Sequence, residues 1–195
     1  MAPSAAEWER GLTTRIGQAI QRLRGEQGLS AQRLSDRLAE LGLDMSRASI
    51  SALENGKRPY VTVGEVMLIA RALNTSPIAL IFPGLDYDER IDLLPDTKNT
   101  QLGGVFWFSG EFAYTEPGSL TDDPKLSSDN LRLLRLSRYL FEERGQMSNI
   151  EAQLAIANSS DENQIKLLTA TRTRTAKTVA ELTDSRRAEV ERRGG

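Results

Sequence analysis

Residues 46–58 read Ser-Arg-Ala-Ser-Ile-Ser-Ala-Leu-Glu-Asn-Gly-Lys-Arg, and this run decides how the N-terminal part of the chain folds. Ser46 is a residue type that begins helices, and the Asn-Gly pair is one that ends them. Ile50 and Leu53 lie three residues apart, so they share a helix face that must be buried. The opposite face then carries small residues and one long donor, Arg47. The major groove of DNA can admit such a helix, although an ordinary surface helix fits this run equally well.

The flanking sequence predicts four more short helices. Within residues 14–27, the apolar residues recur at helical spacing and form one stripe, which is typical of an amphipathic helix. Ser30 is placed to cap a second helix, whose leucines recur at helical intervals. Thr62 to Glu65 fits a capping box that opens a fourth helix, and Ser76-Pro77 opens a fifth. Five short helices with short connections predict a compact helix-turn-helix domain.

Residues 14–82 resemble the phage-repressor, or XRE, family of DNA-binding domains, whose fold is the five-helix, lambda-repressor-like one. The stretches that carry the resemblance are IGQAIQRLR at 16–24, GLS at 28–30, SRASISALENG at 46–56 and IARAL at 69–73. Two departures stand out. Ala31 lies where family members place a glutamine, with Gln32 one place later. The stretch 38–44 is also longer than the usual turn, and it leaves the docking angle of the recognition helix open.

The resemblance implies that residues at the start of the third helix read base edges. Arg47 is the first candidate, because a guanidinium can donate twice to guanine; a phosphate contact is the alternative. Capping is the stronger expectation for Ser46, and turn chemistry is the alternative for Asn55. Glu54 is expected to be structural, paired with an arginine inside the domain. The expected DNA-binding residues are Arg47, Ala48, Ser49, Ser51, Ala52, Ser46, Asn55, Lys57, Arg58, Gln32 and Arg33.

Composition excludes several kinds of chemistry. The 195-residue chain has no cysteine and no histidine, which excludes disulfides, cysteine–histidine zinc sites and histidine acid–base catalysis. No phosphate-binding loop or dinucleotide fingerprint is present. We therefore expect no catalytic residues, no metal, no cofactor and no enzyme activity. With no signal peptide and no apolar run of about 20 residues, we expect a soluble, cytoplasmic protein without a membrane segment.

Charge is distributed unevenly along the chain. The formal net charge is −2, yet residues 1–85 hold ten Lys and Arg against eight Asp and Glu. The N-terminal half is therefore slightly basic and the remainder acidic. Affinity for DNA must then come from the local placement of cations rather than from net charge.

The segment 84–126 differs from what precedes it, because proline and glycine interrupt it repeatedly, a pattern that argues against long helices. Within it, residues 105–114 (VFWFSGEFAY) hold nearly half of the aromatic residues. A short strand or hairpin packing on the helical domain is the preferred interpretation. The alternative is a small-molecule pocket that uses Trp107 and Glu111.

Apolar residues return at near-heptad spacing in residues 127–195, which predicts two long helices, antiparallel or continuing. Two-fold dimers match palindromic operators, so we expect a homodimer through these helices. A monomer on an asymmetric site, with a second DNA contact from C-terminal arginines and lysines, is the alternative. The expected seam residues are Leu133, Leu136, Leu140, Met147, Ile150, Leu154, Ala157, Ile165, Leu168, Val179 and Leu182, with Arg172 and Thr175 between them.

These observations predict a mainly α protein. Its expected parts are an N-terminal extension (1–13), a helix-turn-helix domain (14–83), a linker with a short aromatic segment (84–126) and a C-terminal helical region (127–195). The expected function is sequence-specific binding of double-stranded DNA by a transcriptional regulator, a repressor of the phage or mobile-element kind that occupies its operator. The alternative is an antitoxin-like or partner-regulated adaptor whose C-terminal helices bind another protein.

Overall fold

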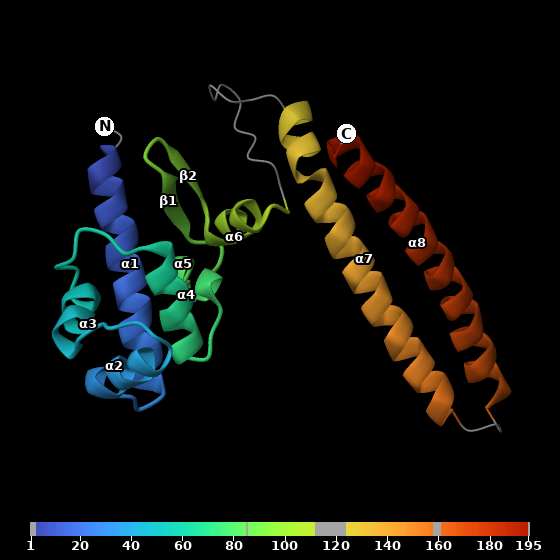
Figure 1. Cartoon of the computed structure of the whole chain (residues 1–195), viewed down its shortest axis with the longest axis horizontal. Coiled ribbons are helices and arrows are strands. Elements are labelled where there is room, and N and C mark those ends of the chain that lie inside the picture. The colour runs from blue at the N-terminus through green and yellow to red at the C-terminus, as the bar shows by residue number, and fades with distance from the viewer. Residues whose placement is uncertain (1–2, 85, 112–123, 158–160, 195) are drawn as a thin grey trace. The chain divides into compact units, whose positions relative to one another are not determined.

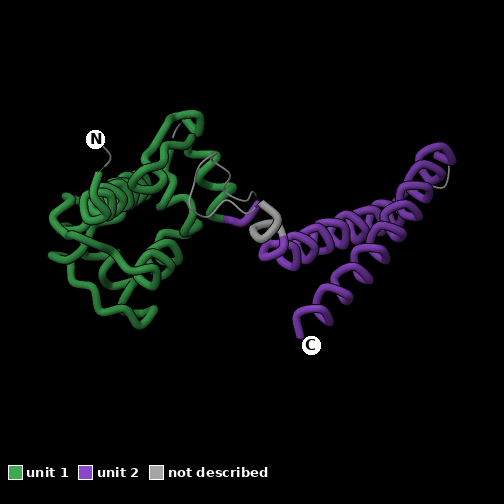
Figure 2. Tube along the Cα trace, turned by 90° about the horizontal axis from the view of Figure 1, so that it is seen from above, with its two compact units in different colours: residues 1–108 green, residues 109–195 purple. Residues whose placement is uncertain are grey.

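The computed structural model describes residues 3–84, 86–111, 124–157 and 161–194, with residues 124–128 described by their backbone alone (Figure 1). The chain is mainly helical and divides into two compact units, residues 1–108 and 109–195 (Figure 2). The first unit contains the helix-turn-helix domain, and the second contains two long helices. The elements of the first unit are α1 (Ala5–Glu26), α2 (Ala31–Glu40), α3 (Arg47–Glu54), α4 (Val63–Ala72), α5 (Pro77–Ile81), β1 (Arg90–Leu94), β2 (Thr97–Thr100) and α6 (Gln101–Ser109).

The five helices predicted for the N-terminal domain are all present, and their predicted start signals act as caps. The hydroxyl groups of Ser30, Ser46, Thr62 and Ser76 each accept a hydrogen bond from the first turn of the helix that follows. The helices enclose one apolar core, as the 3.6-residue spacing requires. Its most deeply buried side chains are Ile20, Leu34, Leu38, Ile50, Leu53, Ile69, Leu73 and Leu80.

Helix α1 begins at Ala5, nine residues earlier than the sequence indicated at Thr14. A capping box opens it: the amide of Glu7 donates to Ser4 Oγ, and the amide of Ser4 donates to Glu7 Oε2 at 2.8 Å. Further along the helix, the Trp8 indole donates to the carbonyl of Asp92 on β1 at 3.3 Å. This cap and this contact extend the helix through residues that were expected to be an N-terminal extension.

The middle segment contains short strands, as expected, but at a different place. Strands β1 and β2 pair antiparallel, with Arg90 opposite Thr100 and a register irregularity between Asp92 and Leu94. The expected strand or hairpin over residues 105–114 is wrong for residues 105–109, which form the second half of α6. Residues 112–114 of that expectation lie outside the described residues.

Close packing explains why this aromatic stretch is helical. A Cβ atom added to Gly104 would lie 2.5 Å from Cε1 of Phe82, so α6 sits directly against the phenylalanine that follows α5. The Phe82 and Phe108 rings then meet edge to face, with their centroids 5.9 Å apart. Tertiary contacts of this kind override the weak strand preference of aromatic residues.

The second unit is an antiparallel pair of helices, α7 (Pro124–Ile156) and α8 (Glu162–Gly194). Three contacts fix their alignment: Arg193 donates to the carbonyl of Asp129, Arg186 Nε donates to Ser137 Oγ at 3.1 Å, and Arg172 Nε lies 3.4 Å from Glu151 Oε1. The antiparallel arrangement is therefore the one of the two predicted alternatives that forms.

The predicted seam between these helices is confirmed by burial. Leu140, Ile150 and Thr175 are buried, and the other apolar seam residues are half-buried. Arg172 departs from the seam, because its side chain is exposed and pairs with Glu151. A two-helix layer has no second layer to cover it, which is why most seam residues remain only half-buried.

Candidate nucleic-acid interface

Helix α3 is held by its apolar face and leaves its other face free. Ile50 and Leu53 are each 1% exposed, whereas Arg47 and Ala48 lie on the exposed side. Ser46 accepts a hydrogen bond from the amide of Ser49 at 3.1 Å, and the two hydroxyl groups lie 3.0 Å apart. The helix therefore presents Arg47 from its first position, beside two hydroxyl groups that are already engaged with each other.

Helix α1 approaches the end of α3 at Gly17. A Cβ atom added there would lie 2.1 Å from the carbonyl oxygen of Leu53, so only glycine allows this contact. Sequence reasoning missed Gly17. Its one signal was a glycine inside an otherwise regular amphipathic helix, which often marks close packing.

An ion pair also joins α1 to α3. Arg24 Nε donates to Glu54 Oε1 at 2.7 Å and Arg24 Nη2 to Glu54 Oε2 at 3.0 Å. The hydrogen bond to Glu54 raises the pKa of Arg24. Arg24 Nη1 also donates to the carbonyl of Leu29, so the same side chain contacts the segment just before α2. The structural role predicted for Glu54 is confirmed, and Arg24 is its partner.

The long connection between α2 and α3 is an ordered part of the domain. Helix α2 ends at Glu40, and Gly42 takes a positive φ of 84°, which the turn requires. Met45 is buried, and its carbonyl accepts a hydrogen bond from Ser35 Oγ at 2.8 Å. These contacts tie the extra residues to α2, so the longer turn forms outside the helix instead of extending it.

The end of α3 is closed by a Schellman motif. Gly56 has a φ of 65°, its amide donates to the carbonyl of Leu53, and the amide of Lys57 donates to that of Ala52 at 2.8 Å. Asn55 Nδ2 donates to the carbonyl of Ser51 at 2.7 Å. Asn55 thus has the local turn role that was its alternative interpretation, and the motif places Lys57 immediately beyond the helix.

The two loop cations have different surroundings. Lys57 is exposed, and within the described residues it forms no ion pair. Arg58 is half-buried, and its Nη2 donates to both carboxylate oxygens of Glu65, at 2.9 and 3.2 Å. Glu65 in turn accepts from the amide of Thr62 in the capping box of α4. The Arg58 side chain is therefore engaged with Glu65 at the start of α4, whereas the Lys57 charge has no ion-pair partner among the described residues.

The expected residues on α2 also differ from one another. Gln32 and Arg33 are exposed, and Gln32 Nε2 donates to Asp36 Oδ1 at 2.8 Å within the helix. Arg37, on the same helix, donates to the carbonyl of Ala72 at 3.0 Å and so caps the end of α4. On α3, Ser49, Ser51 and Ala52 are half-buried. Ser46 and Asn55 are exposed but make local hydrogen bonds. The other exposed side chains of the expected set are Arg47, Ala48, Lys57, Gln32 and Arg33.

A metal site and a membrane-spanning segment find little support among the described residues. Within those residues, no three histidine, cysteine, aspartate or glutamate side chains are grouped as a metal site would require. None of the described helices is both long enough and apolar enough to cross a membrane. Of the two residues suggested for a small-molecule pocket, Trp107 lines a cavity of the first unit, and Glu111 accepts a hydrogen bond from Arg138 at 2.7 Å.

Residues 15–80 match the family described as a helix-turn-helix domain, which covers about a third of the chain. Comparisons with curated proteins and with solved structures find no match. The matched range contains α2, the turn, α3 and the cations that follow, together with the part of α1 that carries Gly17 and Arg24. The N-terminal unit therefore carries a helix-turn-helix domain of the DNA-binding type, and the match supports a DNA-binding regulator.

Proposed function

We propose that this protein is a sequence-specific transcriptional repressor of the phage-repressor type, which acts by occupying operator DNA. The observation that carries the proposal is the geometry of α3. Its apolar face is anchored against α1 by Gly17 and by the Arg24–Glu54 ion pair, while Arg47 projects from its exposed first turn. A helix held this firmly can place a guanidinium reproducibly against base edges in the major groove. Blocking a promoter requires no catalysis.

Selection of bound sequences from random DNA tests this proposal. The full chain should enrich one motif, and the Arg47→Ala variant should lose discrimination at one position of that motif, at a cost of about 1–3 kcal/mol against the preferred base. Arg71→Ala, which removes an exposed arginine from α4, is the matched control and should leave the motif unchanged. A uniform loss across all sequences would reassign Arg47 to phosphate. Failure of the wild-type chain to enrich any motif would contradict the proposal.

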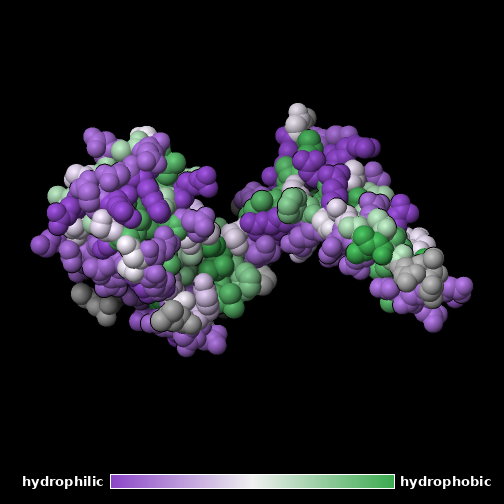
Figure 3. All heavy atoms as spheres, turned by 90° about the horizontal axis from the view of Figure 1, so that it is seen from below, coloured by the Kyte–Doolittle hydropathy of each residue, from purple (hydrophilic) through white to green (hydrophobic). Residues whose placement is uncertain are grey.

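We further propose that two copies pair through the α7–α8 unit, so that two α3 helices meet a palindromic operator. Large apolar side chains remain exposed on this unit: Phe141 is 80% exposed and Ile156 is 84% exposed. Figure 3 shows hydrophobic side chains at the surface of the helical pair among hydrophilic ones. Leu134 and Phe141 lie seven residues apart on α7, so they share a face outside the seam. A second helical pair would cover that face as in a four-helix bundle.

The second unit has two alternative roles, a second DNA contact made by a monomer and the binding of another protein. A monomer with a second DNA contact would use Arg172, Arg174, Lys177, Arg186 and Arg187. Three of them, Arg172, Lys177 and Arg187, lie within 4 Å of a carboxylate on their own unit, and Arg186 donates to Ser137 Oγ. An adaptor that binds another protein would use the same exposed apolar face as the dimer. The oligomeric state of the isolated chain separates these possibilities.

A further inference from the structure

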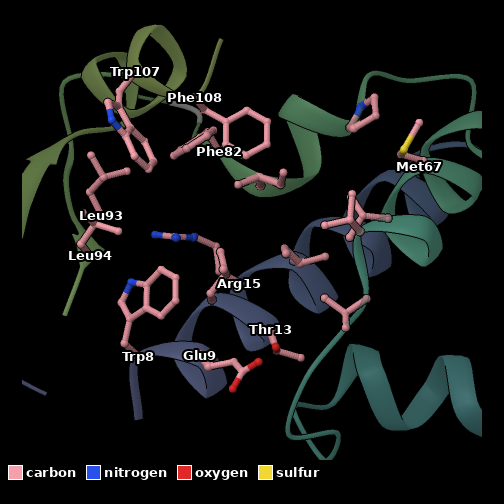
Figure 4. A pocket seen from close by; sticks show the side chains of 17 residues that line it. Trp8, Glu9, Thr13, Arg15, Met67, Phe82, Leu93, Leu94, Trp107 and Phe108 are labelled. Atoms are coloured by element: carbon pink, nitrogen blue, oxygen red, sulfur yellow. The ribbon is translucent and has the colours of Figure 1, made fainter. Parts of the chain in front are cut away.

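A cavity of about 480 Å³ lies within the N-terminal unit, lined by residues of α1, α4, α5, β1 and α6 (Figure 4). Its walls are almost wholly apolar. Four aromatic side chains contribute to them: Trp8, Phe82, Trp107 and Phe108. Cavities of this size and character hold small organic molecules. It is separate from the exposed face of α3, none of whose residues lines it.

The walls of this cavity are fixed by specific contacts. The Trp8 indole donates to the Asp92 carbonyl at 3.3 Å, which holds the ring against the hairpin. On the other side, Gly104 lets α6 approach Phe82, and Phe82 packs edge to face with Phe108. A cavity bounded in this way is already formed before a ligand enters, which lowers the ordering cost of binding.

One cation, Arg15, reaches into the cavity from α1. Figure 4 shows its guanidinium beside Trp8 and the leucines of β1, whereas the Glu9 carboxylate points away from it. Arg15 Nε is buried and has no hydrogen-bond partner in the described part of the chain. A buried donor without an acceptor is costly, so this atom requires a partner that the described protein does not supply.

Two nearby carboxylates do not meet that requirement. Burial lowers the pKa of Arg15, and the charges of Asp92 and Glu89 oppose the shift. Asp92 lies 3.5 Å from Lys98, and Glu89 accepts from Gln101 at 3.0 Å. Neither is close enough to Arg15 for an ion pair among the described residues. Arg15 therefore lines the apolar cavity, and it also lines a second pocket that includes Glu89 and Gln101, while the neighbouring acids have other partners.

We propose that this cavity is a binding site for an aromatic monocarboxylate. The aromatic body of the ligand packs among the tryptophan and phenylalanine rings. The carboxylate accepts hydrogen bonds from Arg15, since a guanidinium matches the planar carboxylate with two donors. A single negative charge is specified because a second one would be left unpaired in an apolar cavity.

The tryptophans provide a direct measurement. The chain contains two tryptophans, and both line the cavity. Titrating the full chain with 4-phenylbutyrate should change their fluorescence with saturation, and the neutral analogue 4-phenylbutyramide should bind about tenfold more weakly or worse, because it cannot form a charge-assisted pair. Equal affinity for acid and amide, or no saturable change at millimolar concentration, would overturn the proposal.

Two variants assign the preference to Arg15. Arg15→Met keeps the length of the side chain and should bind acid and amide equally. Arg22→Met removes the same charge from α1 outside the cavity, where Arg22 pairs with Glu26, and should behave as wild type. A preference for the acid that survives in a folded Arg15→Met protein would rule out Arg15 as the receptor. Should that variant fail to fold, the acid–amide comparison on the wild-type chain still decides. These titrations contain no DNA, so their failure leaves the repressor proposal intact.

Discussion

Arg47 and Lys57 lie at opposite ends of α3 and are suited to different contacts with DNA. Arg47 begins the helix and projects from its exposed face, from which a base edge can be reached. Lys57 follows the Schellman turn, and its ammonium is a compact charge on a flexible stem. A contact between such a charge and a backbone phosphate fixes the position of the protein and adds affinity without reading sequence.

Lys57→Ala should therefore weaken binding to every DNA sequence by a similar factor. It should also lower the slope of log affinity against log salt by about one, since one phosphate contact releases about one counterion. Fluorescence anisotropy at several salt concentrations, with a selected site and an unrelated duplex, measures both effects. Lys98→Ala removes the same charge from β2 and should change neither quantity. A loss confined to the selected site would show that Lys57 reads sequence.

Residue roles could be predicted where the partner is close in sequence. Ser46 was expected to cap α3, and its hydroxyl does accept from Ser49, three residues away. Glu54 was expected to pair with an arginine, but Arg24 lies thirty residues earlier and could not be selected by spacing. Arg58 was expected to bind DNA, and its pairing with Glu65 depends on how the loop folds back onto α4.

At the level of elements, the contact between α1 and α3 determines how α3, the proposed recognition helix, is held in the domain. Gly17→Ala should destabilise the N-terminal unit by about 1–3 kcal/mol, because the added methyl group meets the backbone of Leu53 and forces the helices apart. DNA affinity should fall with it. Denaturant unfolding gives the change in free energy.

Gly11→Ala is the matched control on the same helix, because nothing lies within 4 Å of a Cβ atom at Gly11. That substitution should stabilise the protein by about 0.5–1 kcal/mol through the higher helix propensity of alanine. If both variants were stabilised alike, the contact between α1 and α3 would be looser than the structure indicates.

The elements themselves were predictable to different degrees. The starts of α2 to α5 follow local rules of capping, so Ser30, Thr62 and Ser76 were sufficient to find them. Helix α6 was missed because its helical form depends on Phe82, a contact between segments about twenty residues apart. The hairpin of β1 and β2 was missed because Arg90–Thr100 is polar and short and lacks a strong alternating pattern.

The carboxylate of Glu189 stabilises the end of α8, and its protonation should be measurable. Hydrogen bonds from Arg192 and Arg193, at 2.6 and 2.7 Å, lower the pKa of Glu189 from 4.5 to about 2. Because the folded-state pKa lies below the unfolded value, the stabilisation is fully present above pH 4.5 and is lost as the pH falls towards 2.

Glu189→Gln should therefore lower the melting temperature of the second unit at neutral pH, and this difference should shrink below pH 4.5. NMR titration of the Glu189 carboxyl group measures the midpoint directly. Glu191→Gln, at an exposed position two residues further on, should have little effect at any pH. A Glu189 midpoint near 4.5 would mean that these arginines do not hold the carboxylate in solution.

At the scale of the whole molecule, the first unit has few positive charges and the second unit has an uncovered apolar face. The helix-turn-helix unit has a complete core, but even its more basic part, residues 1–85, holds only ten Lys and Arg against eight Asp and Glu, so one copy has few charges with which to hold DNA. The helical pair has exposed apolar residues and buries few of its own. Pairing two chains through the second unit would cover that apolar face and double the number of DNA contacts at once.

Phe141→Lys tests this arrangement, because a charge at the centre of the proposed face cannot be buried without a partner. We expect the wild-type chain at micromolar concentration to have twice the mass of one chain by light scattering, and the variant to have the mass of one. The variant should lose affinity for a palindromic site but keep that for a half-site, since α3 is unchanged. Gln146→Lys adds the same charge at an exposed polar position of α7 and should remain dimeric. A wild-type chain that is monomeric would remove the dimer and require a single asymmetric operator, whereas a dimeric Phe141→Lys would move the interface to another face.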